Sequence, residues 1–190
     1  MKVDLLTHTA SPDTLCASIA GVCTGVKRPR LSAIIESGHL SVVEHAVFTF
    51  HISGVSRILT HQLVRHRIAS YTQQSQRYTT TACEYVTPPS LAGNVRYSEM
   101  MTLIWALYEA LDVDKEDARY ILPGGACTEI TVTMNARELL HFFKLRCCKR
   151  SQWEIRDMAE LMMGECKKVA PVIFADAGPD CENCREVVKC

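Results

Sequence analysis

The 190-residue sequence predicts a single α+β domain, and three observations support this fold class. Segments with helical periodicity and segments with strand alternation follow one another without the regular strand–helix–strand order of a parallel sheet. A chain of this length that is 47% hydrophobic can bury one sizeable core and is short for two. No internal repeat or low-complexity linker divides it. We expect the domain to span residues 1–175, followed by a cysteine-rich tail at 176–190.

The first half of the chain is expected to contain two strands and three helices. Ser11 and Pro12 are typical of the N-cap and the first position of a helix. Apolar and polar residues alternate around Phe48 and Phe50, which indicates a strand. From Val55 the apolar spacing becomes helical and leads into Arg65, so that Gln62 and Arg65 lie on one side of a helix. In order, we predict a strand at 3–7, a helix from 12, a short helix at 29–38, a strand at 46–53 and a helix from 55.

The second half begins with a loop, because residues 70–77 have no apolar periodicity. Met101 and Trp105 belong to a helical apolar stripe that predicts a buried helix face. Asn135 is a favourable N-cap after a β-branched run. In order, we predict helices at 98–111 and 114–122, a strand at 129–134, and helices from 136 to about 146 and from 151 to about 169.

An arginine-rich segment, Arg65–Arg77, is the strongest functional signal in the chain. It lies between Glu44 and Glu84, a stretch without acidic residues, although the formal net charge of the chain is zero. Arginine without lysine favours planar, bidentate binding of phosphate or carboxylate. The interleaved serine and glutamine side chains both donate and accept hydrogen bonds. We interpret the segment as an anion site, with a solvated basic loop as the alternative.

Composition excludes several other classes of protein. The 21 basic and 21 acidic residues argue against a general nucleic-acid or membrane-surface binder. No run approaches the roughly 20 apolar residues of a membrane span, and the N-terminus lacks the apolar run of a secretory signal. We therefore expect a cytoplasmic protein. Neither a dinucleotide-binding glycine motif nor a P-loop is present, so side chains would hold a phosphorylated ligand.

The arginine-rich segment also matches a known signature. Arg-His-Arg, two residues, Ser, four residues, Ser, one residue and Arg resembles the motif of the flavin-dependent thymidylate synthases. The resemblance covers the chain from about Gly38 to Phe174. Further blocks resemble the family in order and spacing: Gly38-His39 with Ser41 and Glu44-His45, Asp117-Ala118-Arg119, Asn135-Ala136-Arg137, Leu145-Arg146 and Trp153-Glu154-Ile155.

The resemblance implies a fold, an assembly and a reaction. Family members have an antiparallel sheet with helices on its sides and form homotetramers whose active sites are shared between subunits. NADPH reduces FAD, and methylenetetrahydrofolate donates a methylene group to C5 of deoxyuridylate (dUMP). The flavin hydride then completes the methyl group of thymidylate (dTMP).

It also implies three sets of site residues. Arg146 is expected against the uracil ring as the catalytic residue, where a fixed cation stabilises negative charge as N3 loses its proton. Arg119 is expected to reach the substrate phosphate from a neighbouring subunit. The substrate set is Gln62, Arg65, Gln73, Gln74, Ser75, Gln76, Arg77 and Arg119. The FAD set is Ser41, Arg65, His66, Arg67, Ile68, Asn135, Arg137 and His141. Many relatives carry an acid at the position of Gln73, and some carry asparagine at that of His141.

Several alternatives stay open at this stage. Ser75 is expected to contact substrate, and a nucleophilic serine would need an adjacent base. A nucleotide- or nucleic-acid-binding module would need stacking aromatics, for which Tyr71 and Tyr78 are available. A flavin-independent thymidylate synthase would need a Pro-Cys-His nucleophile, which none of the ten cysteines provides. No metal site is expected in the domain, while Cys181, Cys184 and Cys190 of the tail leave zinc, a disulfide or no role open.

Overall fold

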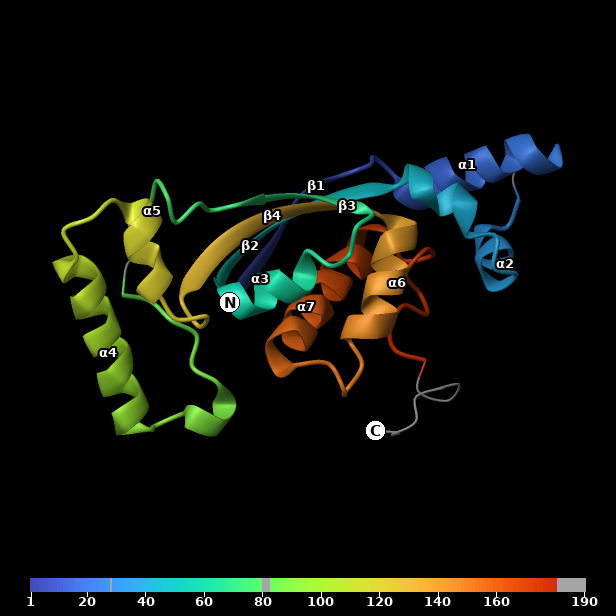
Figure 1. The fold of residues 1–190 in the computed structure, drawn as a ribbon. Helices are drawn as coiled ribbons and strands as arrows, with labels where there is room; N and C mark the ends of the chain where they lie inside the picture. The colour runs from blue at the N-terminus through green and yellow to red at the C-terminus, as the bar shows by residue number, and fades with distance from the viewer. Residues whose placement is uncertain (28, 80–82, 181–190) are drawn as a thin grey trace. The chain divides into compact units, whose positions relative to one another are not determined.

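The computed structural model describes residues 1–27, 29–79 and 83–180 (Figure 1). The three tail cysteines, Cys181, Cys184 and Cys190, lie outside the described residues. The strands are β1 (Lys2–His8), β2 (Val47–Ser56), β3 (Ala69–Gln73) and β4 (Cys127–Asn135). The α-helices are α1 (Pro12–Thr24), α2 (Leu31–Glu36), α3 (Arg57–Leu63), α4 (Val95–Ala110), α5 (Lys115–Ala118), α6 (Ala136–Arg146) and α7 (Trp153–Val169). Short 3-10 helices are η1 (Leu40–His45), η2 (Pro89–Leu91) and η3 (Arg119–Ile121).

The four strands form one sheet in the order β1-β2-β4-β3. Strands β2 and β4 are antiparallel, because Ala46 pairs with Ala136 at one end and Arg57 with Ala126 at the other. Between these ends the hydroxyl groups of Thr49 and Thr133 lie 2.9 Å apart. Strand β3 occupies an edge and is held to β4 where the Gln74 N–H donates to the Glu129 carbonyl. The predicted α+β fold with an antiparallel sheet and flanking helices is confirmed.

The chain divides into two compact units, and every strand contributes residues to both. Unit 1 consists of Met1–Lys2, Ile52–Arg65 and Thr72–Ile130. Unit 2 consists of Val3–His51, His66–Tyr71 and Thr131–Cys190. The division runs through the arginine-rich segment, between Arg65 and His66 and again between Tyr71 and Thr72.

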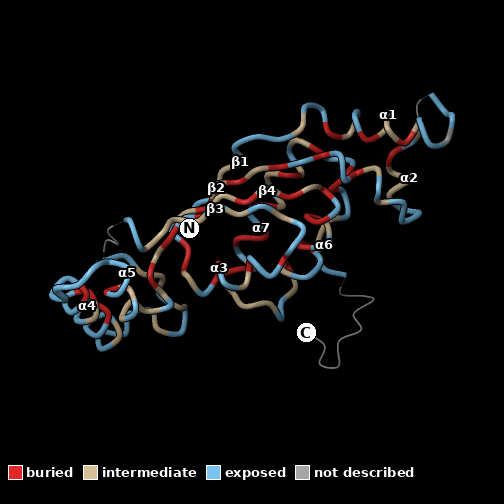
Figure 2. The backbone as a smooth tube through the Cα atoms, turned by 45° about the horizontal axis from the view of Figure 1, so that its top comes forward, coloured by how far each residue is buried: buried red, intermediate tan, exposed pale blue. Residues whose placement is uncertain are grey.

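The core of unit 2 is aromatic. Phe48 of β2 packs edge-on against Phe174, with ring centroids 5.4 Å apart. Phe174 in turn contacts Phe143 of α6 at 5.9 Å. Helices α6 and α7 pack against each other, and their facing sides are buried (Figure 2). This packing fixes α6, which carries the candidate flavin residues Arg137 and His141 and is capped by Asn135.

The core of unit 1 lies on helix α4. Met101 and Trp105 are buried together with Ala126, and Tyr85 and Tyr97 pack against them. The apolar stripe predicted for this helix is therefore core, as expected. The helix begins earlier than predicted, at Val95, because the Asn94 side chain caps it by accepting from the Tyr97 N–H.

Two predictions around the arginine-rich segment are wrong. Helix α3 begins at Arg57, where the Ser56 hydroxyl accepts from the Leu59 N–H, and ends at Leu63, so that Arg65 lies beyond the helix and does not share a helical face with Gln62. Residues 70–73 belong to strand β3 and not to a loop. An edge strand with polar side chains has no apolar alternation, so the sequence pattern could not reveal it.

The helix predicted at 114–122 is also shorter than expected. Only Lys115–Ala118 is α-helical, and η3 follows it to Ile121. In the described part of the chain, no helix is long and apolar enough to cross a membrane.

Asp13 provides a test of the packing in unit 2. Its carboxylate accepts hydrogen bonds from the backbone N–H groups of Val172 (2.9 Å) and Ile173 (3.1 Å), which joins α1 to the segment after α7. Asp13→Ala leaves both amides without this acceptor, and we expect a loss of about 1–2 kcal/mol in the free energy of unfolding. Urea denaturation measures it. Asp112→Ala, at an exposed site after α4, is the matched control, and equal losses in the two variants would contradict this role.

Candidate active site

The arginine-rich segment follows α3, contains β3 and ends in a turn. The hydroxyl of Tyr71 donates to the backbone carbonyl of His66 at 2.8 Å, which fixes the chain between the helix and the strand. At the far end, the Ser75 carbonyl accepts from the Thr79 hydroxyl, and the Ser75 hydroxyl accepts from the Arg77 N–H. Ser75 therefore stabilises a turn. The Tyr71 hydroxyl is already hydrogen-bonded within the protein.

In unit 1 the predicted substrate residues are half-buried or exposed. The Nε2 group of Gln73 donates to the hydroxyls of Thr60 (2.9 Å) and Thr128 (3.4 Å). Arg65 is exposed, and its Nη2 lies 2.9 Å from Nε2 of His61. Gln62, Gln74, Ser75 and Gln76 are half-buried.

Two of the predicted substrate arginines meet at one acidic residue. Arg77 donates to Oε2 of Glu116 at 2.7 Å, and Nε of Arg119 donates to the Glu116 backbone carbonyl at 2.9 Å. The hydrogen bond to the Glu116 carboxylate raises the pKa of the Arg77 guanidinium, which also lies over the Tyr78 ring. Arg77 and Arg119 are thus close to each other within one chain.

Unit 2 contains a pocket of about 620 Å³ beside helix α6. Four of the predicted flavin residues line it: Ile68, Asn135, Arg137 and His141. Its remaining lining residues were not predicted, and they are Leu40, Glu44, Glu138, Leu140 and Lys144. Arg137 pairs with the carboxylate of Glu44. Ser41 is exposed and follows Leu40 in η1, and Arg67 is exposed next to Ile68.

The lining combines the two properties that a flavin nucleotide requires. Arg137 and Lys144 are cations suited to a diphosphate, and they lie two turns apart on α6. Leu40, Ile68 and Leu140 offer apolar surface for a planar ring. The residues present therefore fit FAD.

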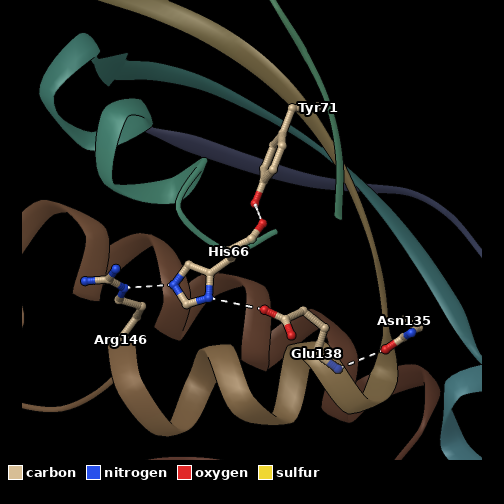
Figure 3. A network of polar contacts seen from close by, with 5 residues as sticks. All are labelled: His66, Tyr71, Asn135, Glu138 and Arg146. Atoms are coloured by element: carbon tan, nitrogen blue, oxygen red, sulfur yellow. Dashed lines mark hydrogen bonds and ion pairs between the residues drawn. The ribbon is translucent and has the colours of Figure 1, made fainter. Parts of the chain in front are cut away.

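A buried polar chain runs beside this pocket (Figure 3). Nε of Arg146 donates to Nε2 of His66 at 3.0 Å, and Nδ1 of His66 lies 3.2 Å from Oε1 of Glu138. The N–H of Glu138 donates to the side chain of Asn135, which caps α6. The His66 ring packs edge-on against Phe142 at 4.9 Å. The chain thus joins the arginine-rich segment to both ends of α6.

His66 is neutral in this arrangement, although its contact with Glu138 has the geometry of an ion pair. The Arg146 N–H points at Nε2, which must therefore carry a lone pair, and the single proton resides on Nδ1. Burial, together with the nearby Arg146 and His141, lowers the pKa of His66 to about 4. Burial also raises the pKa of Glu138 and lowers that of Arg146.

The structure separates the predicted residues into two groups. Arg146 and the flavin set other than Arg65 belong to unit 2, whereas the substrate set belongs to unit 1. Sequence reasoning missed Glu138 and Lys144, which lie on the same helix as Arg137 and His141. Their residue types give no local signal, because charged residues are common on helices. Glu138 follows an N-cap asparagine by three residues, so its carboxylate is easily interpreted as a helix-capping group alone.

Comparison with known proteins identifies the family. Residues 4–172 match the family model described as "Thymidylate synthase complementing protein". A flavin-dependent thymidylate synthase of Geobacter sulfurreducens is 48% identical, over 95% of this chain and 88% of the relative. The chain belongs to the flavin-dependent thymidylate synthase family. The family expected from the arginine-rich motif is thereby confirmed.

Solved structures agree on the fold. A UMP/dUMP methylase, PolB from Streptomyces cacaoi bound with 5-Br dUMP, superimposes with a TM-score of 0.80 over 92% of this chain and 93% of that one, at 24% identity. A flavin-dependent thymidylate synthase from Helicobacter pylori, complexed with FAD and dUMP, gives a TM-score of 0.76 over 94% of this chain and 100% of that one, at 22% identity.

The lowered pKa of His66 makes stability depend on pH. Between pH 6.5, the ordinary value, and about 4, the unfolded chain binds a proton that folded His66 does not, so stability falls as the pH is lowered. Above pH 6.5 the lowered pKa of His66 adds roughly 3 kcal/mol at most to the free energy of unfolding, relative to low pH.

His66→Asn should lose this dependence, because asparagine does not titrate. Urea denaturation of both proteins from pH 7 to pH 4 measures the difference in the pH dependence of stability. The carboxylates titrate in both proteins, so their effect cancels in this difference. Parallel curves for wild type and variant would show that His66 titrates normally.

Proposed function

We propose that this protein catalyses the reductive methylation of dUMP to dTMP, with methylenetetrahydrofolate as carbon donor and NADPH as reductant. The observation that carries the proposal is the family match over residues 4–172, together with 48% identity to a flavin-dependent thymidylate synthase. The expectation of an enzyme of this activity with FAD as cofactor is confirmed at the level of the family. NADPH, the folate donor, the homotetramer and the cytoplasmic location are the finer parts of the proposal.

The pocket on α6 is proposed to hold FAD. Arg137 and Lys144 would bind its phosphates, while Ile68 and His141 would lie against the rest of the molecule. When bound, the flavin supplies the hydride that completes the methyl group. Ser41, Arg65 and Arg67, which lie outside the pocket lining, are proposed to complete the flavin site.

The residues of unit 1 are proposed to bind dUMP. Arg77 and Arg119 carry fork-shaped donors for a phosphate, and Arg119 is proposed to reach the phosphate bound by a neighbouring subunit. Both bonds of Gln73 within the chain use its Nε2, so its carbonyl oxygen can accept a hydrogen bond from the base. Gln73 thus contributes neutral hydrogen bonds where many relatives have an acid. Gln62, Arg65, Gln74, Ser75 and Gln76 complete the proposed set.

Arg146 is proposed to act on the uracil ring. A cation that is already fixed stabilises negative charge on the ring without reorganising during the reaction. His66 supplies that fixation through Nε2. Tyr71 and Tyr78 remain the aromatic residues available for stacking on bases, and the family match favours the enzyme over the nucleic-acid-binding alternative.

A coupled assay tests this function. The purified protein should oxidise NADPH only in the presence of FAD, and dUMP should accelerate the oxidation. Thymidylate should form when methylenetetrahydrofolate is added. Formation of thymidylate without flavin and NADPH would contradict the proposal.

Arg146→Lys tests the catalytic assignment, because it keeps the charge and removes the planar fork. Methyl transfer should fall about 10²-fold or more, by analogy with the loss of an oxyanion-hole donor. Reduction of bound FAD by NADPH without dUMP should stay near the wild-type rate, since no charge develops on uracil in that step. Stopped-flow measurement of each half-reaction separates the two. An equal fall in both half-reactions would indicate a structural role.

A further inference from the structure

We propose that Glu138 is a positioning residue for Arg146 and acts through the imidazole of His66. The inference rests on the proposed role of Arg146 in methyl transfer. It concerns a residue that neither the motif nor the family match assigns. Glu138 would be a part of the active site that contacts neither the uracil nor the reacting carbon.

The geometry consists of two consecutive contacts in the interior of unit 2. Oε1 of Glu138 lies 3.2 Å from Nδ1 of His66, and the other ring nitrogen accepts from Nε of Arg146 at 3.0 Å. Glu138 and His66 are each 7% exposed. Glu138 is fixed at the start of α6 by Asn135, and Arg146 is the last residue of the same helix.

The donor and acceptor roles of Glu138, His66 and Arg146 follow from Glu138 onward. A carboxylate has no proton to donate, so its neighbour Nδ1 must carry the imidazole proton. The opposite nitrogen, Nε2, then has a lone pair for the Arg146 N–H. Glu138 therefore selects the only neutral tautomer of His66 that can bind the guanidinium.

Loss of the carboxylate removes that selection. The proton can then move to Nε2, where it faces the N–H of Arg146, and two donors repel each other. Arg146 would leave its present orientation, although its charge and its helix are unchanged. Because Nε is bound to His66, the terminal NH2 groups of Arg146 are left to bind a ligand. The orientation of Arg146 therefore determines which of its donors can contact the substrate.

Several charged groups surround Glu138. Burial raises the pKa of its carboxyl group, and His141, which follows it on α6, opposes that shift and favours the ionised form. Arg137, Lys144 and Glu44 line the same pocket. Burial, and after it the negative charge of Glu138, raises the pKa of the neighbouring Tyr71 hydroxyl.

A spectroscopic experiment tests the tautomer without any cofactor. In ¹⁵N-histidine-labelled protein at pH 7, the His66 signals should show a protonated Nδ1 and an unprotonated Nε2. Glu138→Gln keeps an acceptor and should keep this tautomer, whereas Glu138→Leu should populate the Nε2–H form. A wild-type His66 protonated at Nε2 would overturn the proposal, whatever the variants do.

A double-mutant cycle tests the consequence for catalysis in the FAD-loaded enzyme. Glu138→Leu should slow methyl transfer about 10- to 100-fold, the scale of a hydrogen bond to a charged group. In the Arg146→Lys background the same change should cost no more than about twofold, because its effect passes through Arg146. Glu138→Gln should retain most of the wild-type rate.

Glu44→Leu is the matched control, since it removes another carboxylate from the same pocket wall without touching His66. Any effect that it has should be the same in both backgrounds. An equal factor for Glu138→Leu in both backgrounds would overturn the proposal. Absence of thymidylate formation by the wild type would instead refute the proposed function, and the tautomer measurement would still decide the role of Glu138.

Discussion

The neutral imidazole of His66 is the interaction on which the candidate site depends. It is buried between a cation, Arg146, and a carboxylate, Glu138, and it can bind both only as the Nδ1–H tautomer. This one ring connects the arginine-rich segment to the beginning and the end of α6. The pKa of His66 is lowered chiefly because the ring is buried, and also because a second positive charge would lie beside Arg146.

One face of helix α6 packs in the core of unit 2, and another face lines the pocket. Leu139, Phe142 and Phe143 are buried in unit 2, whereas Arg137, His141 and Lys144 recur at intervals of one turn along the pocket. Antiparallel pairing of β2 with β4 places the start of this helix next to Ala46, at the end of η1. The pocket is therefore built from segments that are about 90 residues apart in the sequence.

Periodicity was sufficient for the elements that have one buried face. The alternation around Phe48 and the stripe of Met101 and Trp105 predicted a strand and a helix that the structure contains. Asn135 was correctly identified as a cap because its residue type acts locally. For the site, the family resemblance predicted Ile68, Asn135, Arg137 and His141 as flavin residues, and these four line one pocket.

The remaining features depend on tertiary neighbours and leave no local pattern. The polar edge strand β3 has no apolar face, so it was mistaken for a loop. Glu138 and Lys144 differ from ordinary charged helix residues only in what lies opposite them. Similarly, Arg77 and Arg119 both bind Glu116, although Arg77 lies about 40 positions away in the sequence. Sequence spacing cannot predict such a contact.

A crystal structure of the protein with FAD and dUMP bound would show whether His66 orients Arg146 toward the uracil. We predict the flavin in the α6 pocket against Ile68, Arg137 and His141. We also predict Arg146 at the uracil ring with its Nε still bonded to Nε2 of His66. A flavin bound elsewhere, or an Arg146 turned away from the uracil while His66 stays bonded to Glu138, would contradict this prediction.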